Sequence, residues 1–315
     1  MQFKSAASGQ RAAVGKGAFL LGTDVAQLLA QAGVQRETLV DSGLQVERRR
    51  TAGGHTYFLA NWSDQPVHAW VPLATTAKAA NLYDPMTGQL GVASLRQSAQ
   101  GRPEVYVQLA PGGSCLLDTK TTAATGPAYA YHRPTSAPQP VAGPWEVRFV
   151  SGGPTLPAPL RATQLDSWTK LAGEAGQKFA GTAQYTTSFA LPLGAAEGYL
   201  LDLGRVGQSA RVQLNGQDLG TLIGPAYQLY VPKSQLKATN TLAVSVSNGM
   251  ANRIADMDRT GQEWKQFYNV NMAAKLKENR GADGLFTAAQ WAPIESGLLG
   301  PVTLTPVAAG GPPPQ

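Results

Sequence analysis

Short segments in which apolar and polar residues alternate, separated by turn-forming residues, constrain the fold more than any other feature of the chain. Trp145, Val147 and Phe149 alternate with polar residues, which is the period of a strand with one buried face. Further strand patterns lie at 179–191, 199–203, 211–214, 218–222, 227–231, 241–246 and 301–305. Asn215-Gly216 lies between two of these segments and predicts a hairpin, because both residue types tolerate positive φ. Many short strands with frequent turns are typical of an antiparallel β-sandwich.

A second group of strand patterns predicts a smaller β domain over residues 44–119. Gly53-Gly54 lies between two such segments, where a hairpin turn is expected. The run 84–88 (DPMTG) predicts another turn, because proline fixes φ and glycine allows positive φ. The composition agrees, since 35 Gly and 22 Pro with only 15% charged residues suit a turn-rich β protein.

The first 43 residues predict a different local structure, a strand followed by a helix. The apolar run 18–21 fits a buried strand, and Thr23 or Asp24 can cap the helix that follows. One face of that helix would carry Val25, Leu28, Leu29 and Ala32. We expect residues 1–43 to be the terminal β-α unit of an α/β domain that is otherwise missing or truncated, or to pack on the following domain.

Two segments lack strand patterns. Residues 120–143 are rich in Thr, Ala, Pro and Gly and predict a linker, which can also wrap the sandwich as an ordered strap through Tyr129 and Tyr131. Residues 308–315 predict a disordered tail. The chain is therefore predicted to be mainly β, with a small β-sandwich domain, an antiparallel jelly-roll sandwich over 144–307 and a short N-terminal α/β remnant.

The net charge and the single cysteine indicate which partners the chain can have and exclude an internal disulfide. A net charge of +6 and a pI of about 9.4 favour acidic partners such as an acidic polysaccharide. The basic residues are scattered, so we predict no nucleic-acid partner. Cys115 is the only cysteine, sits in an apolar context and predicts a buried thiol without an internal disulfide. No apolar run reaches transmembrane length, and residues 1–9 lack the apolar core of a signal peptide.

Residues 249–296 form a long stretch with little regular patterning, and long ordered loops are often functional. The stretch contains the acids Asp256, Asp258, Glu263, Glu278, Asp283 and Glu295. Flat aromatic rings suit the apolar face of a sugar, while amides and carboxylates bind its hydroxyl groups. The candidate sugar-binding residues in and next to the stretch are Trp264, Tyr268, Trp291, Asn248, Asn252 and Asp256.

Three alternatives stay open for these residues. The tryptophans can instead fold the loop onto the sandwich. The acids can be surface groups or ion-pair partners of Arg253, Arg259, Lys265 and Arg280. Two of the acids can also form a glycosidase pair, which requires carboxyl groups about 5–10 Å apart across a sugar.

Five motifs carry a resemblance to a known family. They are 179–185 (FAGTAQY), 199–206 (YLLDLGRV), 210–220 (ARVQLNGQDLG), 240–248 (NTLAVSVSN) and 296–302 (SGLLGPV). In this order they resemble the sugar-binding, galactose-binding-like jelly-roll domain of glycoside hydrolase family 2. The closing motif and the upstream β domain are more similar to the C-terminal region of family 106 α-L-rhamnosidases. The resemblance covers roughly residues 14–306.

The resemblance implies hydrolysis of a terminal rhamnosyl bond by two carboxylates in the host enzyme. These carboxylates are expected on an N-terminal catalytic barrel, so no catalytic residue carries over to this chain. The resemblance also implies that calcium can assist the host enzyme, but the sequence shows no local loop pattern for that ion. The full-length enzyme is expected to be periplasmic or secreted.

The sequence therefore predicts an accessory carbohydrate-binding or structural region of a glycoside hydrolase. The expected partners are a rhamnosyl oligosaccharide or polysaccharide, which can be acidic and pectic, and a missing N-terminal catalytic domain. One alternative is a structural or interaction module with no ligand site. Another is a self-sufficient glycosidase that uses two carboxylates of residues 249–296.

Overall fold

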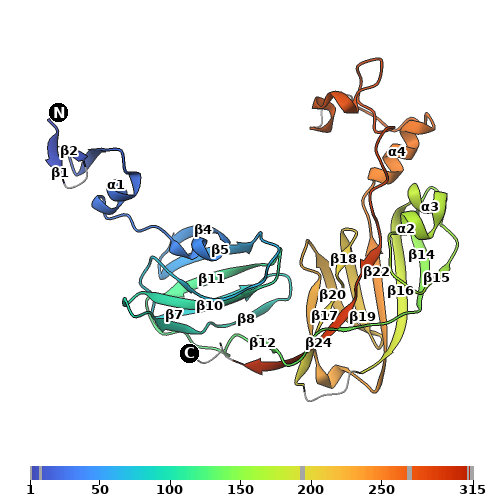
Figure 1. The fold of residues 1–315 in the computed structure, drawn as a ribbon, viewed down its shortest axis with the longest axis horizontal. Coiled ribbons are helices and arrows are strands. Elements are labelled where there is room, and N and C mark those ends of the chain that lie inside the picture. Colours follow the sequence, from blue (N-terminus) through green and yellow to red (C-terminus); the bar gives the residue numbers. More distant parts are fainter. Residues whose placement is uncertain (1, 7–8, 192–195, 268–271, 311, 313–315) are drawn as a thin grey trace. The chain divides into compact units, whose positions relative to one another are not determined.

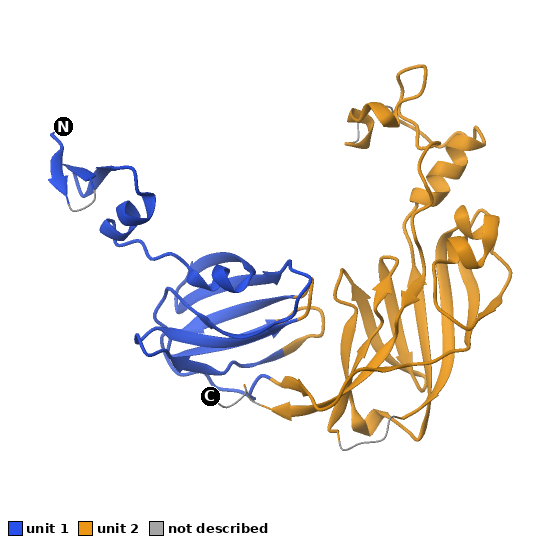
Figure 2. Ribbon diagram, viewed as in Figure 1, with its two compact units in different colours: residues 1–83, 90–109, 114–129 blue, residues 84–89, 110–113, 130–315 orange. Residues whose placement is uncertain are grey.

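The computed structural model describes residues 2–6, 9–191, 196–267, 272–310 and 312 (Figure 1). The chain divides into two units (Figure 2). Unit 1 comprises residues 1–83, 90–109 and 114–129, and unit 2 comprises residues 84–89, 110–113 and 130–315. Each unit consists mainly of antiparallel sheets, which confirms the predicted mainly β fold.

Unit 1 contains a five-stranded sheet in the order β4-β5-β11-β7-β8 and a three-stranded sheet in the order β6-β10-β9. The buried side chains Tyr57, Leu82, Val105 and Leu117 come from both sheets and are at most 2% exposed. The predicted hairpin joins β4 to β5, with its turn at Ala52-Gly53, one residue earlier than expected, and Cys115 is buried. The strands are β4 Leu44–Thr51, β5 Gly54–Asn61, β6 Val67–Pro72, β7 Ala79–Asp84, β8 Gln89–Val92, β9 Leu95–Gln97, β10 Pro103–Leu109 and β11 Ser114–Lys120.

The N-terminal segment contains the predicted strand and helix, but their setting differs from the prediction. The carboxylate of Asp24 caps the helix by accepting a hydrogen bond from the Gln27 amide at 3.1 Å. The strand β3 pairs antiparallel with β2 instead of lying in a parallel sheet, because a tight turn with Gly15 at φ 57° joins the two strands. The elements are β1 Lys4–Ala6, β2 Gly9–Val14, β3 Gly17–Leu21, α1 Val25–Gln31 and η1 Thr38–Ser42.

Unit 2 is a sandwich of a six-stranded sheet, in the order β15-β14-β16-β22-β19-β20, and a sheet in the order β12-β24-β17-β21. One core cluster joins Tyr185 and Val244 of the first sheet to Leu201 and Leu304 of the second. The elements are β12 Tyr131–Pro134, β13 Gln139–Pro140, β14 Trp145–Gly153, β15 Leu160–Ala162, α2 Trp168–Leu171, α3 Gly173–Gln177, β16 Ala180–Ala190, β17 Gly198–Asp202, β18 Arg205–Val206, β19 Ser209–Leu214, β20 Gln217–Ile223, β21 Gln228–Pro232, η2 Lys233–Gln235, β22 Thr239–Ser247, β23 Leu298–Gly300 and β24 Thr303–Gly310.

The predicted Asn-Gly hairpin is present between β19 and β20, with Asn215 at φ 54° and Gly216 at φ 82°. The side chain of Asn215 adds tertiary contacts, since its amide donates to the Asn240 side chain at 3.0 Å and its oxygen accepts from the Thr241 amide at 3.0 Å. This turn therefore fixes both the hairpin and the adjacent strand β22.

Two segments predicted to lack strands contain them. Within the predicted linker, β12 and β13 pair with β24, and Tyr131 is only 2% exposed, as the strap alternative expects. Pairing with β24 supplies the order that the short, proline-containing sequence does not signal by itself. The predicted disordered tail was wrong for residues 308–310, which belong to β24. Residues 311 and 313–315 lie outside the described residues.

Candidate functional site

The segment between β22 and β23 leaves the sandwich and folds as a small structure of its own, which we call the excursion (residues 249–295). It contains α4 Ala251–Arg259 and the short helices η3 Ala273–Lys275 and η4 Lys277–Asn279. The sequence did not indicate α4, because one of its three buried positions is the polar Asn252 and it has no side-chain N-cap. The apolar residues Ala251, Ile254 and Ala255 do recur at helical spacing, but without a start signal the segment was not recognised as a helix.

The two ends of the excursion are held together by side-chain amides. Asn252 donates to the carbonyl of Ile294 at 2.9 Å and accepts from its amide at 2.7 Å. Asn248 accepts from the Gly181 amide at 2.8 Å and donates to the Ser296 hydroxyl at 3.1 Å. Both predicted sugar-binding asparagines thus use their side chains to fix the base of the excursion.

The two predicted stacking tryptophans pack inside the excursion. The ring centroids of Trp264 and Trp291 lie 6.5 Å and 5.8 Å from that of Phe286, in edge-to-face arrangements. The indole nitrogen of Trp291 donates to the Asn279 side chain at 2.7 Å. These contacts give the excursion its own small core, together with the buried residues Ala255, Ala274 and Ala288.

The carboxylate of Asp258 bonds both to a side chain of this core, Trp264, and to the charged Lys265. It accepts hydrogen bonds from the Trp264 indole at 2.7 Å and the Ala288 amide at 2.7 Å, and it lies 2.9 Å from the Lys265 ammonium. Its side chain is only 6% exposed. Burial acts to raise the pKa of the Asp258 carboxyl, but the hydrogen bonds from Ala288, Lys265 and Trp264 and the charge of Lys265 hold the pKa below its ordinary value. Asp258 is therefore ionised at neutral pH.

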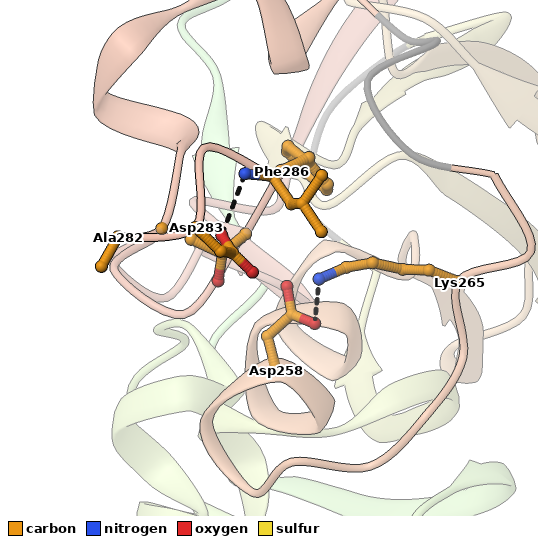
Figure 3. A pocket seen from close by; sticks show the side chains of 8 residues that line it. Asp258, Lys265, Ala282, Asp283 and Phe286 are labelled. Atoms are coloured by element: carbon orange, nitrogen blue, oxygen red, sulfur yellow. Dashed lines mark hydrogen bonds and ion pairs between the residues drawn. The ribbon is translucent and has the colours of Figure 1, made fainter.

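A pocket of about 480 Å³ opens beside this ion pair. Figure 3 shows the Asp258–Lys265 pair and the carboxylate of Asp283 among the side chains that line it. Asp283 accepts a hydrogen bond from the Leu285 amide at 2.9 Å, which fixes its turn. The lining residues are Asp258, Lys265, Gly281, Ala282, Asp283, Leu285, Phe286 and Thr287.

The remaining predicted site residues lie elsewhere. Asp256 forms an ion pair with Arg253 on α4, and Tyr268 lies outside the described residues. Sequence reasoning named Lys265 among the possible ion-pair partners of the loop acids, which the Asp258–Lys265 pair confirms, but it did not predict that Asp283 lies beside this pair. No local motif signals this group, because α4, the following loop and the 281–287 turn each supply one charged residue.

In each ion pair of the excursion, a nearby cation neutralises the carboxylate. Besides the pairs of Asp256 and Asp258, Glu295 pairs with Arg205 and lies 3.6 Å from the Lys170 ammonium. Two of the cations expected as partners bind carbonyl groups instead, since Arg259 donates to Ala289 and Arg280 donates to Ala274. A glycosidase general acid needs a raised pKa, whereas the pKa of Asp258 is lowered.

Neither a cluster of metal-ligating side chains nor a membrane-spanning helix occurs among the described residues. They contain no group of three or more His, Cys, Asp or Glu side chains able to hold a metal ion, so the calcium implied by the resemblance finds no such donor set there. Within the same part of the chain, none of the helices has the length and apolar character needed to span a bilayer.

Comparisons with known proteins agree with the sequence resemblance. No family model matches the chain. A solved rhamnosidase from Novosphingobium sp. PP1Y matches 93% of the chain with a TM-score of 0.65 and 28% identity. A curated protein of Formosa agariphila, provisionally named a beta-glucuronidase, is 32% identical in an alignment of 190 residues that covers 54% of the chain.

These relatives are much longer than the matched region. The chain spans 27% of the rhamnosidase and 16% of the Formosa agariphila protein. A Bifidobacterium dentium beta-glucuronidase matches 36% of the chain and 21% of its own length at 28% identity, with a TM-score of only 0.31. The first two matches confirm the predicted resemblance to glycoside hydrolases and relate the chain to carbohydrate-active proteins.

Proposed function

We propose that this chain is an accessory carbohydrate-binding region of a glycoside hydrolase that acts on rhamnose-containing oligosaccharide or polysaccharide. One observation carries the proposal: a rhamnosidase matches 93% of the chain at a TM-score of 0.65. A match of this extent includes residues of both units, whereas a match to the sandwich of unit 2 alone would leave the substrate class open.

The proposed role is accessory because cations within the protein already engage three of the six acids of the excursion. Asp258 is held ionised, and Asp256 and Glu295 are paired with arginines. The matched region is 27% of the rhamnosidase, so most of that protein lies outside the match. We place the catalytic carboxylates and any calcium ion of the host enzyme in such a separate domain.

The N-terminal segment is the proposed contact surface for that domain. Its side chains Phe19, Leu21, Val25 and Leu29 are between 44% and 66% exposed, and α1 has no buried residue. Apolar side chains gathered on one small sheet and helix are typical of a surface that another domain covers.

The proposed sugar contacts lie at the pocket of the excursion. Its lining combines hydroxyl-binding groups, the Asp283 carboxylate and the Lys265 ammonium, with the apolar side chains Ala282 and Leu285. Because Asn248, Asn252 and the two tryptophans already bond within the protein, their contribution is to hold the shape of this site.

Calorimetric titration of the full chain with rhamnosyl oligosaccharides tests the proposal. We expect Ala282→Trp to abolish the binding heat, because Ala282 is an exposed pocket residue and indole would fill the space. The matched variant Ala238→Trp changes another exposed alanine of unit 2 and should bind as the wild type does. No heat from the wild type, or equal heats from all three proteins, would reject a sugar site at this pocket.

A structural module with no ligand site is the second candidate. The packing of Trp264 and Trp291 against Phe286 favours it, because this packing gives both rings a structural role in the core of the excursion. The same titration separates the two functions, since a structural module gives no saturable heat with any oligosaccharide.

A further inference from the structure

We infer that the pocket bounded by Asp258, Lys265 and Asp283 takes neutral, hydroxyl-rich sugar units in preference to uronates, and that Asp283 sets this preference. The inference rests on the proposed carbohydrate binding and names the class of ligand for that site. What a ligand meets in this pocket depends on how far the charge of each lining residue is already neutralised by its neighbours.

The Lys265 ammonium is already neutralised. It lies 2.9 Å from the Asp258 carboxylate, and the two side chains are only 15% and 6% exposed. The same nitrogen lies 5.4 Å from the ring centroid of Trp264 and 5.6 Å from that of Phe286. A ligand carboxylate therefore meets a cation whose charge is compensated, and a ligand cation finds these two rings already engaged by an ammonium.

The Asp258 carboxylate is equally well compensated. It receives the Trp264 indole and the Ala288 amide in addition to Lys265. If Lys265 paired with a ligand carboxylate instead, Asp258 would remain buried with one hydrogen-bond donor fewer. A buried charge without enough partners is costly in free energy. The pair thus stays intact and contributes no net charge to the pocket.

Asp283 supplies the charge that remains. It is exposed, and within the described residues the structure shows no cation paired with it. A Cβ at Gly281 would lie 2.9 Å from an oxygen of Asp283, so the glycine leaves room for this carboxylate. Since one oxygen accepts from the Leu285 amide, the other is available to accept from sugar hydroxyls. The lining therefore attracts hydroxyl groups and repels a uronate carboxylate.

The indole N–H signal of Trp264 offers a local probe, because this group donates directly to the pocket residue Asp258. We would label the full chain with nitrogen-15, assign the signal with Trp264→Phe, and titrate with methyl rhamnoside and methyl glucuronide. We expect the rhamnoside to bind roughly fivefold more tightly, as a like charge a few ångströms away in water would require.

Asp283→Asn isolates the cause. Asparagine keeps an oxygen that can accept from the Leu285 amide, so the turn persists while the charge is removed. We expect this variant to bring the two dissociation constants within about twofold of each other. Asp218→Asn removes a carboxylate from the exposed ion pair with Arg211 on the same unit and should leave the wild-type preference unchanged.

The outcomes separate the two claims. Equal binding of both sugars by the wild type, or an unchanged preference in Asp283→Asn, would overturn the inferred selectivity and leave carbohydrate binding standing. A Trp264 signal that no sugar shifts, including the rhamnosyl oligosaccharides, would overturn the proposed sugar site and the selectivity together. Circular dichroism of each variant confirms that the comparison concerns folded protein.

Discussion

At the scale of single residues, polar side chains of this chain mostly fix local structure. Asn248, Asn252 and Ser296 illustrate this, because each side chain bonds to backbone or side-chain groups that close the base of the excursion. The side-chain amides of Asn248 and Asn252 suggested hydroxyl recognition, and the sequence could not show that groups within the protein already bind them. Residue type therefore did not predict the structural role of these side chains.

Gly297, next to this base, has no room for a side chain. Its φ is 100°, and a Cβ would lie 2.3 Å from the Tyr185 hydroxyl and 3.0 Å from the Trp168 ring. We expect Gly297→Ala to lower the free energy of unfolding by about 2–4 kcal/mol, through overpacking added to backbone strain. Urea unfolding measures it. Gly261→Ala is the control, because it has φ 67° but open space, and should cost only about 1–2 kcal/mol.

Asp258 makes stability depend on pH. Because its pKa in the folded state is lowered, its contribution is complete above the unfolded pKa and disappears as the pH falls through the folded value. We expect Asp258→Asn to lose about 2–3 kcal/mol at pH 7, and the difference from wild type to shrink below about pH 4. Denaturant unfolding at several pH values tests this. A difference that stays constant down to pH 2 would contradict it.

At the scale of elements, local patterns predicted the strands well and the excursion poorly. Alternation at Trp145, Val147 and Phe149 predicted β14 because one face of that strand is buried. By contrast, β12 depends on pairing with the distant β24, and α4 buries Asn252 on the face it turns inward. The pocket was not predictable for the same reason, since Asp258 and Asp283 come together only through the small core around Phe286.

The amide clamp of Asn252 should control the excursion as one element. We expect Asn252→Ala to increase hydrogen exchange in α4 and in residues 281–291, while the amides of β16 and β22 stay protected, because the clamp holds only the base of the excursion. The stability loss should be about 1–3 kcal/mol. Asn81→Ala in unit 1 serves as the control. Uniform loss of protection across the sandwich would show that the excursion is not a separate element.

The exposed face of α1 should tolerate polar substitution. Val25 is 66% exposed and Leu29 is 44% exposed. We expect the double variant Val25→Ser, Leu29→Ser to change the free energy of unfolding by less than about 1 kcal/mol and to reduce self-association measured by light scattering. A large loss of stability would show that these side chains pack within the chain and are not available to a partner domain.

At the scale of the whole molecule, each of the two units has its own buried apolar core. The relatives that match the chain extend well beyond the matched region. We propose that catalysis belongs to a part of the host enzyme outside this chain, while the chain presents a polar pocket beside the Asp258 carboxylate, which is ionised at neutral pH.

Calorimetry of the 315-residue chain with a rhamnosyl oligosaccharide, followed beyond saturation, tests the account most directly. Binding without catalysis predicts heats that saturate, vanish in Ala282→Trp and return to baseline after each injection. A sustained heat flow with release of free rhamnose would show that the chain hydrolyses the sugar itself. The absence of any heat would show that this region does not recognise the sugar, and either result would contradict the account.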